Sequence, residues 1–201
     1  GSGGGVTPRP RLRLSGRHHE ELRRLLLPGD GVEAVALALC GRHSTDGHEY
    51  LLVHEVVPVP EHEYRDRAPA RVSWGTDWLM PIMTKAEARQ QAVLKVHSRP
   101  NGFEAFSQLD DESDRRLFPS VYGWTQDVPV HASAIMLPDG GLLARGVLDD
   151  GAFIPMDRIM VVGDSISVAD AVDGESDPAP WATRHAQALG AGTASLLRRL
   201  R

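Results

Sequence analysis

The feature that most constrains this chain is a short apolar run that ends at a histidine and is soon followed by a serine and an aspartate. Residues 92–96 have the composition of a buried strand, and His97 follows them directly. Ser107 has the chemistry of a helix N-cap, and Asp110 falls in the first turn, where the helix dipole favours a negative charge. These three side chains are expected to converge, and imidazole and carboxylate ligands suit zinc.

The spacing of these residues resembles that of the JAMM (JAB/MPN) zinc isopeptidases, whose pattern is His-x-His, seven residues, Ser, two residues, Asp. His97, Ser107 and Asp110 fit this pattern at every spacing. Arg99 stands where the pattern has its second histidine, and a guanidinium has no usable lone pair for zinc near neutral pH. Residues 110–124 (DDESDRRLFPSVYGW) also resemble a segment of bacterial domains of this family.

A second candidate site residue is Glu33, the one charge in an almost continuously apolar run over residues 32–41. Such a run predicts a strand that is buried on both faces. The pattern alone favours a solvated glutamate at the strand edge, since glutamate is seldom buried. The stretch from Glu33 to Gly41 also resembles the family segment that carries the catalytic glutamate. The resemblance therefore implies that Glu33 is the general base.

The resemblance implies a role for each matched residue. His97, the residue at position 99 and Asp110 would bind Zn²⁺, and Glu33 would take the proton of the metal-bound water. Ser107 would stabilise the oxyanion, a contribution of about 3 kcal/mol for one such donor. With Arg99 present, His97 and Asp110 are the two remaining protein ligands, so we expect weak zinc binding. The guanidinium can instead fill the zinc position and pair with Glu33 or Asp110.

These observations leave three functional hypotheses open. The first is a JAMM-type zinc-dependent isopeptidase or peptidase acting on ubiquitin-like protein conjugates or precursors, with its metal site altered by Arg99. The alternative is a catalytically inactive MPN module that binds a ubiquitin-like protein or a fused or partner activating enzyme. Arg99 favours this module, whereas intact Glu33, Ser107 and Asp110 favour the enzyme. In the third, Arg99 is a single change in an otherwise working enzyme.

The order of predicted elements indicates an α/β protein, with a mixed, curved sheet flanked by helices. The resemblance implies the JAB/MPN (cytidine-deaminase-like) fold. The expected strands are residues 11–14, 32–41, 49–59, 72–74, 92–97, 128–137, 142–147 and 154–162. The expected helices are 17–27, capped by Ser15, 76–91, and one from Ser107 that ends before Pro119. Residues 42–48 and 61–72 are expected to be loops, and Asp111 and Asp114 to be solvated or paired with arginines.

The missing zinc ligand makes the other histidines worth examining. Four of them lie in or beside the expected hairpin: His43, His48, His54 and His62. Their spacing follows no metal pattern, so each is better interpreted as a solvated or core histidine, and His54 is the one inside a strand. His131 and Ser133 share one side of a strand, but no nucleophile-elbow sequence surrounds them, which disfavours a catalytic pair.

The chain divides into four parts by composition. Residues 1–5 are a Gly/Ser linker that we exclude from the fold, residues 6–163 are the JAMM-like domain, and residues 164–180 are an acidic linker. Residues 181–201 predict a helical appendage. This last segment resembles the lead-in to a ThiF-like adenylyltransferase domain, which occurs fused to bacterial JAMM domains. The resemblance therefore implies such a domain as a partner in cis, beside a ubiquitin-like protein or its conjugate.

Composition and charge exclude some classes of binding partner. A length of 201 residues suits one domain with an appendage, and the formal net charge of −5 argues against a nucleic-acid partner. The single cysteine, Cys40, lies in an apolar run, which predicts a small buried hydrophobic residue in a reducing cytoplasm. No apolar run approaches the length of a membrane span, so no membrane partner is expected.

Overall fold

The computed structural model describes residues 7–163 and 166–170. The strands are β1 (Arg9–Ser15), β2 (Val35–Thr45), β3 (His48–Pro58), β4 (Tyr64–Ala68), β5 (Arg71–Trp74), β6 (Ala92–Ser98), β7 (His131–Met136), β8 (Leu142–Val147), β9 (Phe153–Pro155), β10 (Arg158–Val162) and β11 (Ile166–Asp170). The helices are α1 (Gly16–Leu26), α2 (Met80–Ala88) and α3 (Gln108–Trp124), with short 3-10 turns η1 (Glu61–Glu63) and η2 (Asp77–Leu79).

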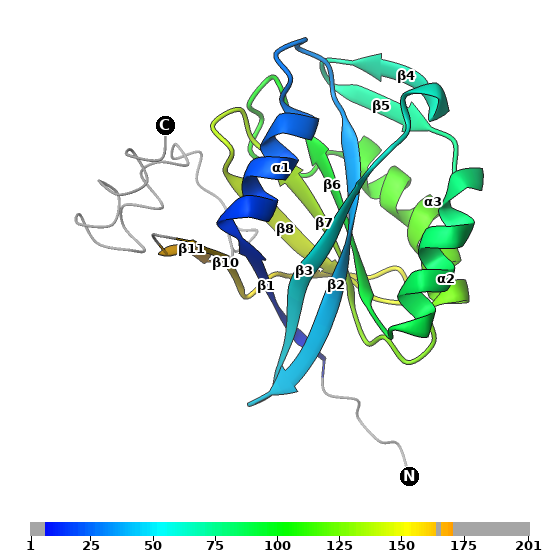
Figure 1. The fold of residues 1–201 in the computed structure, drawn as a ribbon, viewed down its shortest axis with the longest axis vertical. Helices are drawn as coiled ribbons and strands as arrows, with labels where there is room; N and C mark the ends of the chain where they lie inside the picture. Colours follow the sequence, from blue (N-terminus) through cyan, green and yellow to red (C-terminus); the bar gives the residue numbers. More distant parts are fainter. Residues whose placement is uncertain (1–6, 164–165, 171–201) are drawn as a thin grey trace.

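Nine of these strands form one mixed sheet, in the order β11-β10-β1-β3-β2-β6-β7-β8-β9 (Figure 1). Strand β1 runs parallel to both of its neighbours, β10 and β3, and β6 runs parallel to β7. The other pairings in the sheet are antiparallel. Strands β4 and β5 form a separate hairpin at the top of the view. The prediction of an α/β protein with a mixed, curved sheet is confirmed.

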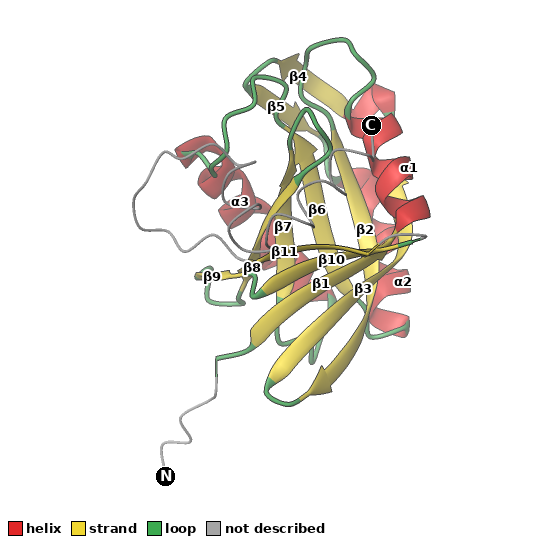
Figure 2. Ribbon diagram, turned by 90° about the vertical axis from the view of Figure 1, so that its left-hand side faces the viewer, coloured by secondary structure: helices red, strands yellow, loops and turns green. Residues whose placement is uncertain are grey.

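Helices cover both faces of the sheet. Figure 2 shows α1 on one side and α3 on the other. On the α1 side, Leu22 and Leu26 pack against residues that include Ala36 and Ala38 of β2. On the other side, α2 and α3 pack against a second core cluster that includes Leu37. Successive residues of a strand point to opposite faces, so burial on both sides explains why residues 35–40 of β2 are all apolar.

The first helix begins as predicted. The Ser15 hydroxyl oxygen accepts a hydrogen bond from the backbone N–H of His18, at 3.1 Å, and α1 follows directly. The second predicted helix is divided instead into η2 and α2. No side-chain cap hydrogen bond is present at Thr76, so the chain enters this helix through a 3-10 turn.

Two predicted loops contain regular structure. Residues 42–48 were expected to form the loop between two strands, but β2 and β3 extend to a tight turn at Asp46 and Gly47, both of which have positive φ. Such a two-residue turn matches the twist of a hairpin, so the strands continue to its edge. Residues 61–72 were expected to be an exposed loop, but they form η1 and most of the β4–β5 hairpin. Alternating charged residues on a half-exposed hairpin hide its period-two pattern.

The prediction that α3 ends before Pro119 is wrong. The helix continues through Pro119 to Trp124. Leu117, Phe118 and Val121 lie on its buried face, so the apolar contacts extend past the proline. Beyond the proline, Val121 is buried, and Tyr122 packs against the same cluster and donates to the Val147 carbonyl, so these contacts offset the roughly 3 kcal/mol that an interior proline costs.

The chain after β8 differs from its expected form. The single strand expected over residues 154–162 is two strands, β9 and β10, and β11 lies inside the range expected to be a linker. The glycine-rich segment 1–5, most of that linker and the helical appendage at 181–201 lie outside the described residues. Among the helices that the structure describes, none is long and apolar enough to cross a membrane.

Candidate functional site

The predicted site residues come together where β6 ends and α3 begins. Strands β2 and β6 are antiparallel, with Val35 opposite His97, and this pairing brings the residue before Ala34 alongside the end of β6. The pairing is fixed further by the Ala34 N–H, which donates to the Ser98 hydroxyl at 2.9 Å. Exposed fractions are 3% for Glu33, 2% for His97, 4% for Arg99 and 8% for Asp110. We call these four residues the site cluster.

Ser107 and Asp110 form a capping box at the start of α3. The Ser107 oxygen accepts from the Asp110 N–H at 3.2 Å, and Asp110 Oδ2 accepts from the Ser107 N–H at 2.6 Å. The Ser107 hydroxyl also donates to Asp110 Oδ2 at 2.8 Å. The predicted N-cap is therefore confirmed. The Ser107 hydroxyl hydrogen is directed to a carboxylate of its own helix, so an oxyanion would have to compete with that carboxylate for it.

Arg99 occupies the centre of the site cluster. Its guanidinium forms an ion pair with Asp110 Oδ2, and its Nε lies 3.5 Å from Glu33 Oε1. A terminal nitrogen of the same group lies 3.2 Å from His97 Nε2. The expectation that this cation pairs with Glu33 or Asp110 is confirmed, and it contacts both carboxylates.

The residues of the site cluster do not fit a zinc ion. Asp110 Oδ2 is occupied by Arg99 and Ser107, and Asp110 Oδ1 lies 3.0 Å from His97 Nε2. His97 Nδ1 is buried without a hydrogen-bond partner, whereas a zinc-bound histidine usually donates its second N–H. Across residues 7–163 and 166–170, no group of three or more His, Cys, Asp or Glu side chains is arranged to hold a metal.

Burial and charge set the protonation of the cluster. Burial raises the pKa of Glu33 to about 7, although the positive charge of Arg99 opposes this shift. Burial lowers the pKa of His97, so its imidazole is neutral near pH 7. For Asp110, burial favours the neutral acid, but the hydrogen bond from His97 and the bonds from Ser107 outweigh it and hold the pKa well below its usual range. The cluster thus contains one firmly ionised carboxylate and one that titrates near neutrality.

A second buried ionic cluster, which we call the α3 anchor, lies beside the first. It consists of Lys95, Asp111, Asp114 and Arg145. Lys95 Nζ lies 2.6 Å from Asp114 Oδ1, and an Arg145 nitrogen lies 2.8 Å from Asp114 Oδ2. Arg145 also pairs with Asp111. These bonds tie the second turn of α3 to β6 and β8, and so hold Asp110 in place.

Aromatic rings complete the α3 anchor. The guanidinium carbon of Arg145 lies 3.9 Å from the ring centre of Phe106 and 3.6 Å from that of Phe153. Phe106 directly precedes the N-cap serine of α3, so the contact also fixes the loop that enters the helix. The expected pairing of Asp111 and Asp114 with an arginine is confirmed, whereas solvation of Asp114 is wrong, because it is fully buried. Sequence reasoning missed the buried Lys95 and the cluster as a whole. A lysine inside the apolar run of β6 is the signal for it, because a buried ammonium requires partners.

A narrow cleft adjoins the site cluster. It is lined by charged and polar residues and by residues of the β4–β5 hairpin and α3: Glu33, Ala70, Arg71, Val72, Trp74, Lys95, His97, Leu109, Asp110 and Ser113. Leu109 of this lining is 54% exposed, and so is Phe103, whose ring centre lies 5.8 Å from the guanidinium carbon of Arg99. Charged and apolar side chains therefore lie together beside the hairpin strand β5.

The other candidate residues lie elsewhere. His54 Nδ1 is 3.4 Å from the Gln91 amide nitrogen, and none of its contacts involves the site cluster within the described residues. His131 Nδ1 accepts from the Val93 N–H, and its Nε2 lies 2.8 Å from the Thr125 hydroxyl, so it is a satisfied core histidine. Cys40 is buried as predicted, and burial raises its pKa to about 12.

Comparisons with known proteins give the chain no family. No protein-family model matches it, and no curated protein does. One similar solved structure is the solution structure of protein DSY2949 from Desulfitobacterium hafniense, at 15% sequence identity and a TM-score of 0.46. The match covers 83% of this chain and 95% of that one.

Proposed function

We propose that this chain contains a JAMM-like (MPN) domain in which the Arg99 guanidinium stands in for zinc, so that the domain binds a ubiquitin-like protein without cutting it. The observation that carries the proposal is the position of Arg99, which contacts Glu33, His97 and Asp110. A tethered cation there neutralises Asp110 and uses the oxygens that a metal would need. The JAB/MPN fold, the zinc requirement of its active relatives and the ThiF-like partner in cis belong to this proposal.

The cleft beside the site cluster supports binding as the retained activity. Its lining combines the exposed Leu109 with charged residues of the site cluster, and residues of strand β5 contribute to it. A flexible tail entering this cleft would meet backbone from β5 and side chains from α3. Neither contact requires a metal.

A second candidate, the isopeptidase, is favoured by one observation. The pKa of Glu33 is raised to about 7, which suits a general base at neutral pH. Glu33 also shares the site with His97, Asp110 and Ser107, which match the family pattern, whereas Arg99 replaces its second histidine. In that case the chain would have to obtain its third ligand from elsewhere.

Zinc content distinguishes the binding module from the isopeptidase. We would measure zinc per chain by elemental analysis, and cleavage of a ubiquitin-like protein joined to a lysine, for this protein, Arg99→His and Arg99→Gln. The glutamine variant removes the guanidinium without adding a zinc ligand, and so controls for loss of the cation alone. We expect about one zinc per chain in Arg99→His only.

Two other results would overturn the proposal. Stoichiometric zinc and cleavage by the unaltered protein would establish the isopeptidase. Absence of zinc from Arg99→His, with its fold confirmed by circular dichroism, would remove the likeness to a JAMM metal site.

A further inference from the structure

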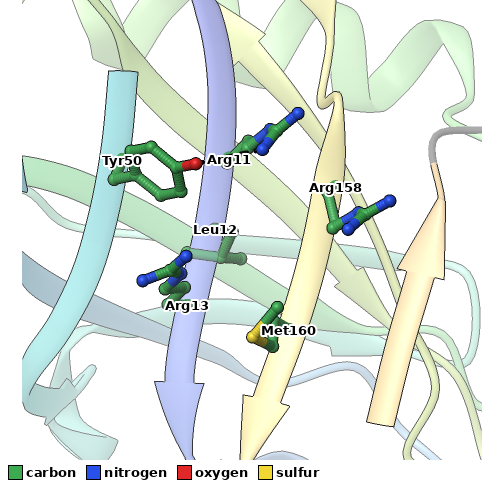
Figure 3. Close-up of a pocket in the computed structure, with 6 residues that line it drawn as sticks. All are labelled: Arg11, Leu12, Arg13, Tyr50, Arg158 and Met160. Carbon is green, nitrogen blue, oxygen red and sulfur yellow. Dashed lines mark hydrogen bonds between the residues drawn. The ribbon is translucent and has the colours of Figure 1, made fainter. Parts of the chain in front are cut away.

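An arginine-rich face lies on the sheet away from the site cluster, on strands β1, β3 and β10. Arg11 is flanked by Tyr50 on one neighbouring strand and Arg158 on the other, and Arg13 aligns with Met160. Figure 3 shows these five side chains around one shallow pocket. We call them the arginine face. The alternate residues of β1 are buried under α1, whereas the described residues place no helix over the arginine face, whose side chains are half-buried or exposed.

The face carries excess positive charge. Asp157 accepts from Arg11 at 2.9 Å and from Arg9 at 3.0 Å, and the Tyr50 hydroxyl accepts from Arg11 at 3.0 Å. The guanidinium carbon of Arg13 lies 4.4 Å from the ring centre of Tyr50, and no carboxylate of the described residues forms an ion pair with Arg13. The chain as a whole has a formal charge of −5, so the charge of Arg13 is opposite in sign to the net charge of the chain.

The sequence supplies an acidic segment at the edge of this face. Strand β11 pairs with β10 so that Asp170 is opposite Arg158, and the next residues are Ala-Val-Asp-Gly-Glu-Ser-Asp. The three acids of this segment, Asp173, Glu175 and Asp177, alternate with other residues. In an extended chain, side chains two residues apart lie on one side at intervals of about 7 Å. Arg11 and Arg13, two residues apart on β1, have the same interval.

We propose that residues 171–177 of this chain dock on the arginine face, with their alternating carboxylates directed at Arg11 and Arg13. The distance is compatible, because residues 171–173 span about 10 Å when extended, and two strand spacings from β11 to β1 also amount to about 10 Å. Attachment through β11 gives the segment an effective concentration in the millimolar range, which favours it over an acidic partner in trans. This inference is independent of the proposed function.

A spin label tests the proposal directly. In the full-length chain, Ser176→Cys would carry a nitroxide, since Cys40 is buried and its thiol has a pKa of about 12. We expect the label to broaden the amide resonances of β1 and β10, with the largest losses near Arg11, Arg13 and Arg158. The broadening is expected to fall at about 1 M NaCl, where the Debye length is about 3 Å.

Charge variants provide the controls. Replacing all three acids (Asp173→Asn, Glu175→Gln and Asp177→Asn) is expected to abolish most of the broadening, and Arg13→Gln to reduce it. Arg116→Gln is the matched control, because the Arg116 side chain is 82% exposed on α3. It should leave the broadening unchanged.

Three results would overturn the proposal: no broadening of β1 and β10, broadening that survives the triple acid replacement, or broadening that arises between molecules. The last is detected by mixing spin-labelled chains without isotope with nitrogen-15 chains without label. Broadening in that mixture equal to that within one chain would assign the face to a second copy.

Discussion

Two buried ionic clusters connect β6 to α3, and they differ in how completely their charges are matched. The α3 anchor pairs two cations, Lys95 and Arg145, with two carboxylates, and Asp114 contacts both cations. In the site cluster, Arg99 stands between two carboxylates, and burial keeps His97 neutral near pH 7. Charge therefore balances in the site cluster when Glu33 holds a proton.

This difference in charge matching indicates a structural role for the α3 anchor and a chemical role for the site cluster. Both carboxylate oxygens of Asp114 have cationic partners, and the Arg145 guanidinium, whose Nε has no hydrogen bond, is stacked against two aromatic rings. In the site cluster, the Arg99 Nε and His97 Nδ1 lack hydrogen bonds. A buried carboxyl group that titrates near neutrality, as Glu33 does, is typical of functional sites. The α3 anchor supplies the rigidity that this site requires.

The largest expected effect comes from breaking the α3 anchor. Asp114→Asn leaves Lys95 and Arg145 buried without their shared counter-charge, so we expect the free energy of unfolding to fall by about 3–5 kcal/mol. Asp110→Asn should cost less, about 1–3 kcal/mol, because Arg99 retains Glu33 as a partner. Urea denaturation measures both. If Asp110→Asn proves the more costly, the assignment of structural and chemical roles is reversed.

The second effect concerns pH and Glu33. Its pKa in the folded protein is about 7, above the ordinary 4.5, so between these values the folded state holds a proton that the unfolded state has released. The stability from this group is complete below pH 4.5 and is lost as pH rises through 7, by at most about 3 kcal/mol.

Glu33→Gln should remove this pH dependence. We would compare urea unfolding at pH 5 and pH 8 for the unaltered protein and the variant, with Glu20→Gln, on the exposed side of α1, as control. A glutamine variant that loses as much stability as the unaltered protein between these pH values would show that Glu33 is not the titrating group.

The smallest expected effect is at the N-cap of α3, where Ser107 bonds to Asp110 of the site cluster. Ser107→Ala removes the hydroxyl that accepts from the Asp110 N–H, and should lower the unfolding free energy by about 1 kcal/mol. Ser107→Gly should cost only a few tenths of a kcal/mol for the cap itself, because glycine is tolerated there. Thermal unfolding distinguishes the two. Equal losses in both variants would mean that the Ser107 bond to the Asp110 carboxylate, rather than the cap, carries the energy.

The sequence was sufficient to predict the part of the site that depends on local spacing. His97 at the end of an apolar strand and Ser107 at a helix start are local patterns, and both were confirmed. The pairing of Arg99 with Glu33 or Asp110 was predicted from the resemblance, which places both carboxylates around the position of Arg99. The α3 anchor was not predicted, because Arg145 comes from a distant strand and the sequence around it does not indicate that it pairs with Asp114. The β4–β5 hairpin was not predicted, because half-exposed charged strands lack the alternation of apolar and polar residues that marks a strand.

Strand β1 imposes an order on how the chain can fold. It is the first strand of the described chain, yet it pairs in parallel with β10, which places Arg11 opposite Arg158. This pairing cannot form until almost the whole described chain has been synthesised. Pairing between such distant segments requires closure of a very long loop, which is slow. During synthesis, the sheet cannot be completed until β10 has left the ribosome, and a chain that stops before Arg158 leaves one edge of β1 without its partner strand.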